Sequence, residues 1–136
     1  VFKDASLSKP GLLRVLAVAT ACIGILVAAG WFIGPLVVSF VSAGRFEIDG
    51  WLVAVIVLSA GLTAAMCTTG PALVAAQRHG ANLAGWCTAA LLTVFALIMP
   101  WPQEVRVSVA LLGPAAIGLM IHSLALWTKT GARPVG

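Results

Sequence analysis

The stretch that decides the fold runs from Trp51 to Gln77, WLVAVIVLSAGLTAAMCTTGPALVAAQ, and is closed by the turn Arg78-His79-Gly80. It holds 27 residues and no charged side chain. A helix needs about 20 consecutive apolar residues to cross the hydrocarbon core of a bilayer. Inside that core a backbone has to satisfy its own hydrogen bonds, and a helix does so. The stretch therefore predicts a transmembrane helix.

Composition extends this prediction to the rest of the chain. The 136 residues are 61% hydrophobic and 9% charged, and the mean hydropathy is +1.09. A soluble domain is about 45–50% apolar and about 25% charged. The chain is therefore expected to be an integral membrane protein with the lipid bilayer as its main partner. The net charge of +4 does not indicate a nucleic-acid partner, because the basic residues form no basic face.

The apolar stretches and the prolines between them predict an all-α polytopic membrane protein. Its four-helix transmembrane domain is expected over residues 12–127, with spans at about 12–30, 50–77, 81–99 and 105–127. Residues 1–11 are expected to form a cytoplasmic leader and residues 128–136 a cytoplasmic tail. Gly34-Pro35 is expected either to kink the first helix or to end it. In the second case a short interfacial helix follows, from Pro35 to Ala43.

The basic residues predict the orientation in the membrane. Six of them fall on one side of the expected spans, namely Lys3, Lys9, Arg14, Arg78, Lys129 and Arg133. Arg45 and Arg106 fall on the other side, together with three of the four acidic residues. Because cytoplasmic loops carry the excess of Lys and Arg, both termini are expected in the cytoplasm. The expected location is the cytoplasmic (inner) membrane, crossed several times, with an uncleaved first helix.

No combination of side chains in the sequence indicates an active site. The carboxylates all lie in the leader or in loops, and no paired acids, nucleophile elbow or phosphate loop is present. Cys22, Cys67 and Cys87 match no metal or redox spacing and are expected to pack in the helices. His122 is expected to serve packing or interface anchoring rather than a functional contact. The chain is therefore expected not to be an enzyme, with no catalytic residue, cofactor or metal site.

Three Gly-Pro pairs, at 34–35, 70–71 and 113–114, interrupt the expected helices. Broken helices line substrate-bearing regions in transporters, but proline is also common in membrane helices that it merely bends. Both interpretations remain open. Thr63, Thr68 and Thr69 are expected to satisfy carbonyls that the second pair frees. Small residues at Ala81, Gly85 and Ala89 predict a smooth packing face on the third helix.

Three segments carry a resemblance to a known family: AAGWFIGPLVVSFVSAGRFEIDGWLVAVIVLSAGL, GPALVAAQRHGANLAGW and RVSVALLGPAAIG. Over residues 10–125 the chain resembles the C-terminal part of bacterial polysaccharide flippases of the multidrug/oligosaccharidyl-lipid/polysaccharide exporter superfamily. The resemblance implies transport of lipid-linked sugars across the cytoplasmic membrane, as part of polysaccharide biosynthesis for the bacterial cell envelope. A lipid-linked oligosaccharide is the substrate that it implies.

The chain departs from that family in size, because family members have many more helices, in two lobes around a central cavity. The resemblance therefore implies a transport component that is incomplete alone and acts with other transmembrane helices or subunits. The polar residues near helix ends are the candidate substrate contacts, namely Arg14, Gln77, Arg78 and His79. The alternative is a structural or accessory subunit of a membrane protein complex with no chemistry of its own. The uncharged helix centres and the small-residue faces favour this alternative.

Overall fold

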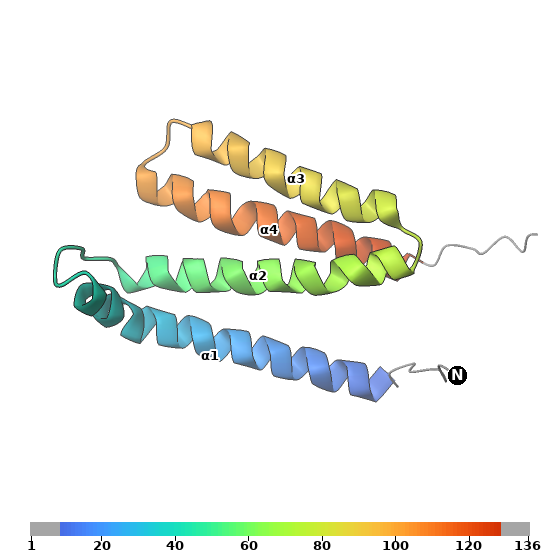
Figure 1. Ribbon diagram of the computed structural model, residues 1–136, viewed down its shortest axis with the longest axis horizontal. Helices are drawn as coiled ribbons and strands as arrows, with labels where there is room; N and C mark the ends of the chain where they lie inside the picture. Colours follow the sequence, from blue (N-terminus) through green and yellow to red (C-terminus); the bar gives the residue numbers. More distant parts are fainter. Residues whose placement is uncertain (1–8, 129–136) are drawn as a thin grey trace, which may run out of the picture. The chain divides into compact units, whose positions relative to one another are not determined.

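The computed structural model describes the backbone of residues 9–128 and the side chains of residues 17–128. This part of the chain is helical and contains no strand (Figure 1). Its four helices are α1 (Lys9–Val41), α2 (Gly50–Ala75), α3 (His79–Ile98) and α4 (Gln103–Trp127). Each is long and apolar enough to cross a membrane, α1 over Ala17–Val41. The predicted class, an all-helical multi-pass membrane protein with four candidate spans, is therefore confirmed.

The chain divides into two compact units within α2, between Val57 and Leu58. The first unit contains α1 and the opening turns of α2, and the second contains the rest of α2 with α3 and α4.

In the first unit, α1 continues through Pro35 to Val41 as one helix of 33 residues. Residues 35–41 thus form the last turns of α1 and not an element of their own, and an interfacial position for them stays a prediction. Proline has no N–H to donate to the carbonyl four residues earlier, here that of Trp31. Gly50 packs against this carbonyl so closely that a Cβ at Gly50 would overlap its oxygen. A Cα–H group therefore covers the oxygen that Pro35 leaves without its helical partner.

The ends of α1 and α2 share one capping arrangement. After α1, Ala43 has a φ of 52° and the Gly44 N–H donates to the Ser39 carbonyl at 2.7 Å. After α2, Gln77 has a φ of 57° and the Arg78 N–H donates to the Leu73 carbonyl at 2.8 Å. Both are Schellman motifs, in which a left-handed residue stops the helix. For this reason α2 ends at Ala75, two residues before the predicted end.

In the second unit, α3 and α4 lie side by side and antiparallel, joined by the turn that contains Pro100-Trp101-Pro102 (Figure 1). Gly85 of α3 is buried against α4, where a Cβ would overlap the His122 ring and lie 3.3 Å from the Gly118 carbonyl oxygen. The close approach confirms the predicted small-residue face at Gly85. The third helix also begins two residues earlier than predicted, at His79.

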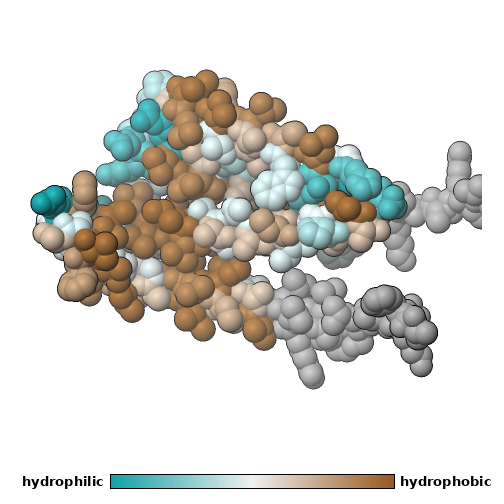
Figure 2. Space-filling view, in the orientation of Figure 1, coloured by the Kyte–Doolittle hydropathy of each residue, from teal (hydrophilic) through white to brown (hydrophobic). Residues whose placement is uncertain are grey.

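The described helices expose large apolar side chains along much of their length. On α3, Leu91 is 71% exposed and Ile98 is 70% exposed. Figure 2 shows apolar side chains over the middle of α3 and α4 and hydrophilic ones gathered near their ends. The fully buried large side chains are few and lie in the second unit, namely Met66, Leu73 and His122. An exterior of this kind is suited to contact with lipid or with further helices.

Candidate functional site: a groove beside the proline break of α2

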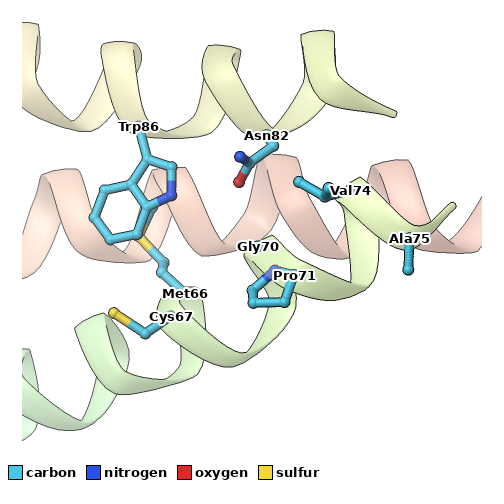
Figure 3. A pocket seen from close by; sticks show the side chains of 8 residues that line it. All are labelled: Met66, Cys67, Gly70, Pro71, Val74, Ala75, Asn82 and Trp86. Atoms are coloured by element: carbon cyan, nitrogen blue, oxygen red, sulfur yellow. The ribbon is translucent and has the colours of Figure 1, made fainter. Parts of the chain in front are cut away.

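A groove with a volume of about 620 Å³ lies between α2 and α3 in the second unit (Figure 3). Residues between Met66 and Ala75 of α2 form one wall, and Asn82 and Trp86 of α3 form the other. The side chains of Val74 and Trp86 are 39% and 38% exposed. The groove therefore reaches the surface of the unit.

Gly70 and Pro71 shape the α2 wall. Pro71 cannot donate to the Cys67 carbonyl, and both residues line the groove. The three threonines expected to compensate donate elsewhere: Thr63 to Ser59, Thr68 to Ala65, and Thr69 to Ala65 and Met66. That prediction is wrong for the Cys67 carbonyl, because each hydroxyl bonds a carbonyl three or four residues earlier in its own helix.

The α3 wall supplies the polar groups of the groove. The Asn82 Oδ1 atom is buried and has no hydrogen-bond partner. A Cβ added at Gly70 would lie 3.0 Å from this oxygen and 3.8 Å from the Trp86 Nε1 atom, a hydrogen-bond donor. Figure 3 shows both side chains reaching from α3 toward α2. A few polar groups in an apolar wall are typical of ligand sites, and they suit an amphiphilic molecule.

His122 of α4 connects the three helices behind the groove. Its side chain is 0% exposed. The ring Nδ1 atom lies 3.0 Å from the Thr69 Oγ1 atom of α2, and the Nε2 atom lies 3.3 Å from the Asn82 carbonyl oxygen of α3. Trp86 meets the ring edge to face, with 6.3 Å between the ring centroids. The packing role that the sequence favoured for His122 is thus realised at a junction of three helices.

A second hollow of about 320 Å³ lies among α2, α3 and α4, and Met66 and Trp86 line it as well as the groove. Thr93 lines it from α3 and donates to the Ala89 carbonyl at 2.9 Å. The same hydroxyl faces the Ala110 carbonyl at 3.5 Å. That carbonyl is the one that Pro114 leaves without its helical donor. Met66 and Trp86 therefore line both hollows, one beside Pro71 and the other beside Pro114.

The structure places three of the four predicted substrate contacts, Gln77, Arg78 and His79, outside the groove lining. The Arg14 side chain lies outside the described residues. Gln77, Arg78 and His79 form the turn between α2 and α3, and His79 is exposed as the first residue of α3. The Arg78 guanidinium donates to the Thr128 hydroxyl at 3.1 Å and to the Thr128 carbonyl, which closes the end of α4. Substrate contact by these residues stays a prediction.

Sequence reasoning missed Asn82 and Trp86 as lining residues. The sequence feature that could have identified them is their spacing of four residues on one helix, with the small residue Gly85 between them. Among the described residues, no group of three His, Cys, Asp or Glu side chains is placed to hold a metal ion.

No family model and no solved structure matches the chain. The chain is 35% identical over 101 residues to "Uncharacterized protein Rv1510" of Mycobacterium tuberculosis, which covers 74% of this chain and 23% of that protein. It is 30% identical over 118 residues to "Uncharacterized protein Mb3654" of Mycobacterium bovis, which covers 84% of this chain and 27% of that protein. The chain thus spans about a quarter of the length of these curated relatives.

Proposed function

We propose that the chain is a transmembrane component of a bacterial flippase that moves lipid-linked sugars across the cytoplasmic membrane, and that it acts together with further helices. The observation that carries the proposal is the groove beside Pro71. A lipid-linked sugar combines a long apolar chain with a polar head. The apolar walls at Pro71 and Val74 suit the chain, and the polar groups of Asn82 and Trp86 suit the first polar atoms of the head.

Pro71 lies inside the continuous helix α2 and removes one of its backbone hydrogen bonds beside the groove. A weakened point of this kind supports a transport role, because transporters build their substrate sites from locally interrupted helices. Pro71 has no N–H to donate to the Cys67 carbonyl. The turns of α2 after Gly70 are therefore joined to the preceding turns by one backbone hydrogen bond fewer. A change in the bend at this point would alter the width of the groove. It would also move Met66, which lines both hollows.

The need for further helices rests on size and on exposed surface. A drug-sized ligand fills a cavity of about 300–1,000 Å³. The groove, at about 620 Å³, lies within that range. It is therefore too small to hold a whole oligosaccharide head. Phe32, Leu36 and Phe40 follow one another every four residues along α1 and are 76%, 69% and 88% exposed. The greater length of the mycobacterial relatives also supports an assembly that is larger than this chain.

Site-specific photo-crosslinking tests the proposal. Cys22→Ser and Cys87→Ser leave Cys67 as the one thiol of the chain, and Cys67 is exposed in the groove wall. A photoreactive label on Cys67 is expected to capture a lipid-linked oligosaccharide added to the vesicles. Excess unlabelled lipid-linked oligosaccharide should reduce the capture, and plain phospholipid should not.

The matched control carries the same label on α3 away from the groove, through Leu91→Cys in a chain without the native thiols. Leu91 is 71% exposed and does not line the groove. Equal capture at positions 67 and 91, or capture that plain phospholipid abolishes, would contradict the proposal. Asn82→Leu is expected to lower capture at Cys67 because it removes the amide of the groove wall.

The alternative is an accessory subunit without a substrate, and the exposed apolar row on α1 favours it. In that case a label at position 36 captures another membrane polypeptide while the label on Cys67 captures no sugar lipid. Capture of a polypeptide at position 36 is expected under both proposals, so the label on Cys67 is the one that separates a transport component from an assembly subunit.

A further inference from the structure

A third hollow, of about 200 Å³, lies between α3 and α4 next to the turn that joins them. Phe95 of α3 and Val109 of α4 line it and are 55% and 39% exposed, so the hollow opens to the exterior of the second unit. We propose that it binds an anionic phospholipid, with one hydrocarbon chain in the hollow and the phosphate beside Arg106. The proposal goes beyond transport and does not depend on it.

The size and lining of the hollow suit a single hydrocarbon chain. Its lining residues on α4 run from Val109 to Ile117, which is about 12 Å at the helical rise per residue. One leaflet of a bilayer contributes about 15 Å, half of the hydrocarbon core. None of the lining side chains is charged, and the Trp101 indole N–H is their one polar group. The volume is below the range of about 300–1,000 Å³ that drug-sized ligands need.

Gly113 opens the hollow on the α4 side. A Cβ added at Gly113 would meet no atom within 4 Å. At Gly85 and Gly118, by contrast, an added Cβ would overlap a side chain of another helix. Gly113 therefore does not serve the close approach of helices in the second unit. It leaves space that a chain from the surrounding lipid can fill.

Arg106 supplies a positive charge at one end of the hollow. It lies three residues before Val109, which puts both on the face of α4 that carries Gly113. Its side chain is partly buried, and with residues 17–128 its guanidinium makes no hydrogen bond or ion pair. Glu104 is two residues earlier and so points to a different face of the helix. The Arg106 charge is therefore open to an anion from outside the unit.

Trp101 lies at the same end of the hollow as Arg106. Long side chains on a helix lean toward its N-terminus, which for Arg106 is the side of the turn that carries Trp101. Tryptophan is enriched where the hydrocarbon core meets the headgroups. The sequence of an apolar hollow, an indole N–H and a guanidinium matches the order of chain and phosphate in a phospholipid. A neutral apolar partner would leave the Arg106 charge without a counter-ion.

Native mass spectrometry of the detergent-solubilised chain tests the proposal, with phosphatidylglycerol and phosphatidylcholine of identical acyl chains as probes. The chain is expected to retain phosphatidylglycerol several-fold more than phosphatidylcholine. An excess of lipid-linked oligosaccharide is expected to leave the bound phosphatidylglycerol in place. Equal retention of the two phospholipids would overturn the proposal, and displacement by the oligosaccharide lipid would assign the hollow to that lipid instead.

A pair of glycine variants tests the place of the lipid chain. Gly113→Leu fills the hollow and is expected to lower the retention of phosphatidylglycerol several-fold. Gly24→Leu, on α1, is the matched control, because a Cβ there also meets no atom within 4 Å. It is expected to retain phosphatidylglycerol like the parent. An equal effect of the two changes, or the release of a second copy of the chain by Gly113→Leu, would overturn the proposal.

A pair of arginine variants tests the place of the phosphate. Arg106→Gln is expected to bring the retention of the two phospholipids close to equality. Arg45→Gln removes the same charge from the exposed turn after α1 and is expected to keep the preference of the parent. An unchanged preference in Arg106→Gln would overturn the proposal. Helical circular dichroism checks the fold of each variant, and where Gly113→Leu does not fold the arginine pair decides.

Discussion

A single residue, His122, explains much of the packing in the second unit. Its imidazole is fully buried between helices because Gly85 leaves space that any other residue would fill. Gly118 does the same for Met66, since a Cβ at Gly118 would lie 2.5 Å from the Met66 Cε atom. Interhelical hydrogen bonds and close backbone approach are the forces that hold helices together in lipid. In the second unit, the hydrogen bonds of His122 and the close approach of the helices both depend on Gly85 and Gly118.

The first prediction concerns Gly85. Gly85→Leu forces the new side chain onto the His122 ring and is expected to lower stability in detergent by about 1–3 kcal/mol, the range for overpacking. Leu91→Ala is the control, because Leu91 is 71% exposed, and it is expected to stay within about 0.5 kcal/mol of the parent. Thermal unfolding of the two variants is the measurement. Equal midpoints would contradict the packing described at Gly85.

Among the helices, three internal prolines produce three different local structures. Pro35 frees the Trp31 carbonyl, which Gly50 covers. Pro114 frees the Ala110 carbonyl, which the Thr93 hydroxyl faces. Pro71 frees the Cys67 carbonyl beside the groove. Pro71 is thus the one of these three prolines that lines the candidate groove.

The second prediction concerns Pro71. Pro71→Ala restores an N–H that can bond the Cys67 carbonyl, and is expected to raise stability by about 1 kcal/mol, the net worth of one hydrogen bond. The stiffer helix should slow amide hydrogen exchange in residues 68–75 and reduce capture of lipid-linked sugar at Cys67. Pro35→Ala, in α1, is the control and should leave capture unchanged. An unaltered exchange rate in residues 68–75 would show that Pro71 does not weaken α2.

The third prediction concerns the two residues with a left-handed backbone conformation that end α1 and α2. Ala43 is held at a φ of 52° and Gln77 at 57°, and a left-handed conformation costs a non-glycine residue roughly 1–2 kcal/mol. Ala43→Gly is therefore expected to raise the free energy of unfolding by about 1 kcal/mol. Ala28→Gly, within α1, should lower it by about 0.5–1 kcal/mol. Chemical denaturation in mixed micelles compares the two. A loss of stability in both would argue against the capping motif after α1.

Sequence alone predicts the four helices because long uncharged stretches have one stable form in lipid. It misplaces the end of α2 and the start of α3 by two residues each, since Gln77 takes the left-handed position that glycine usually marks. It leaves open whether the first helix kinks or ends at Gly34-Pro35, and in the structure α1 continues through Pro35 to Val41, with Gly50 close to the freed carbonyl. Asn82, Trp86 and His122 escape prediction as a group because packing brings them together across 40 residues of chain.

At the scale of the whole molecule, the account depends on lipid as the solvent. The apolar exterior, the uncharged helix centres and the buried hydrogen bonds of His122 are all consistent with a bilayer. In water, the same exposed side chains would drive aggregation. Adjacent loops should then lie on opposite sides of the membrane, as four consecutive spans require.

Labelling of single cysteines from one side of the membrane tests this claim most directly. In a chain with its three native cysteines replaced by serine, Glu47→Cys, Gly80→Cys and Trp101→Cys are introduced one at a time. A membrane-impermeant maleimide added to intact cells is expected to label positions 47 and 101, and to label position 80 only after the membrane is permeabilised. Equal labelling of all three positions in intact cells would contradict the account, because the chain would then not cross the bilayer between them.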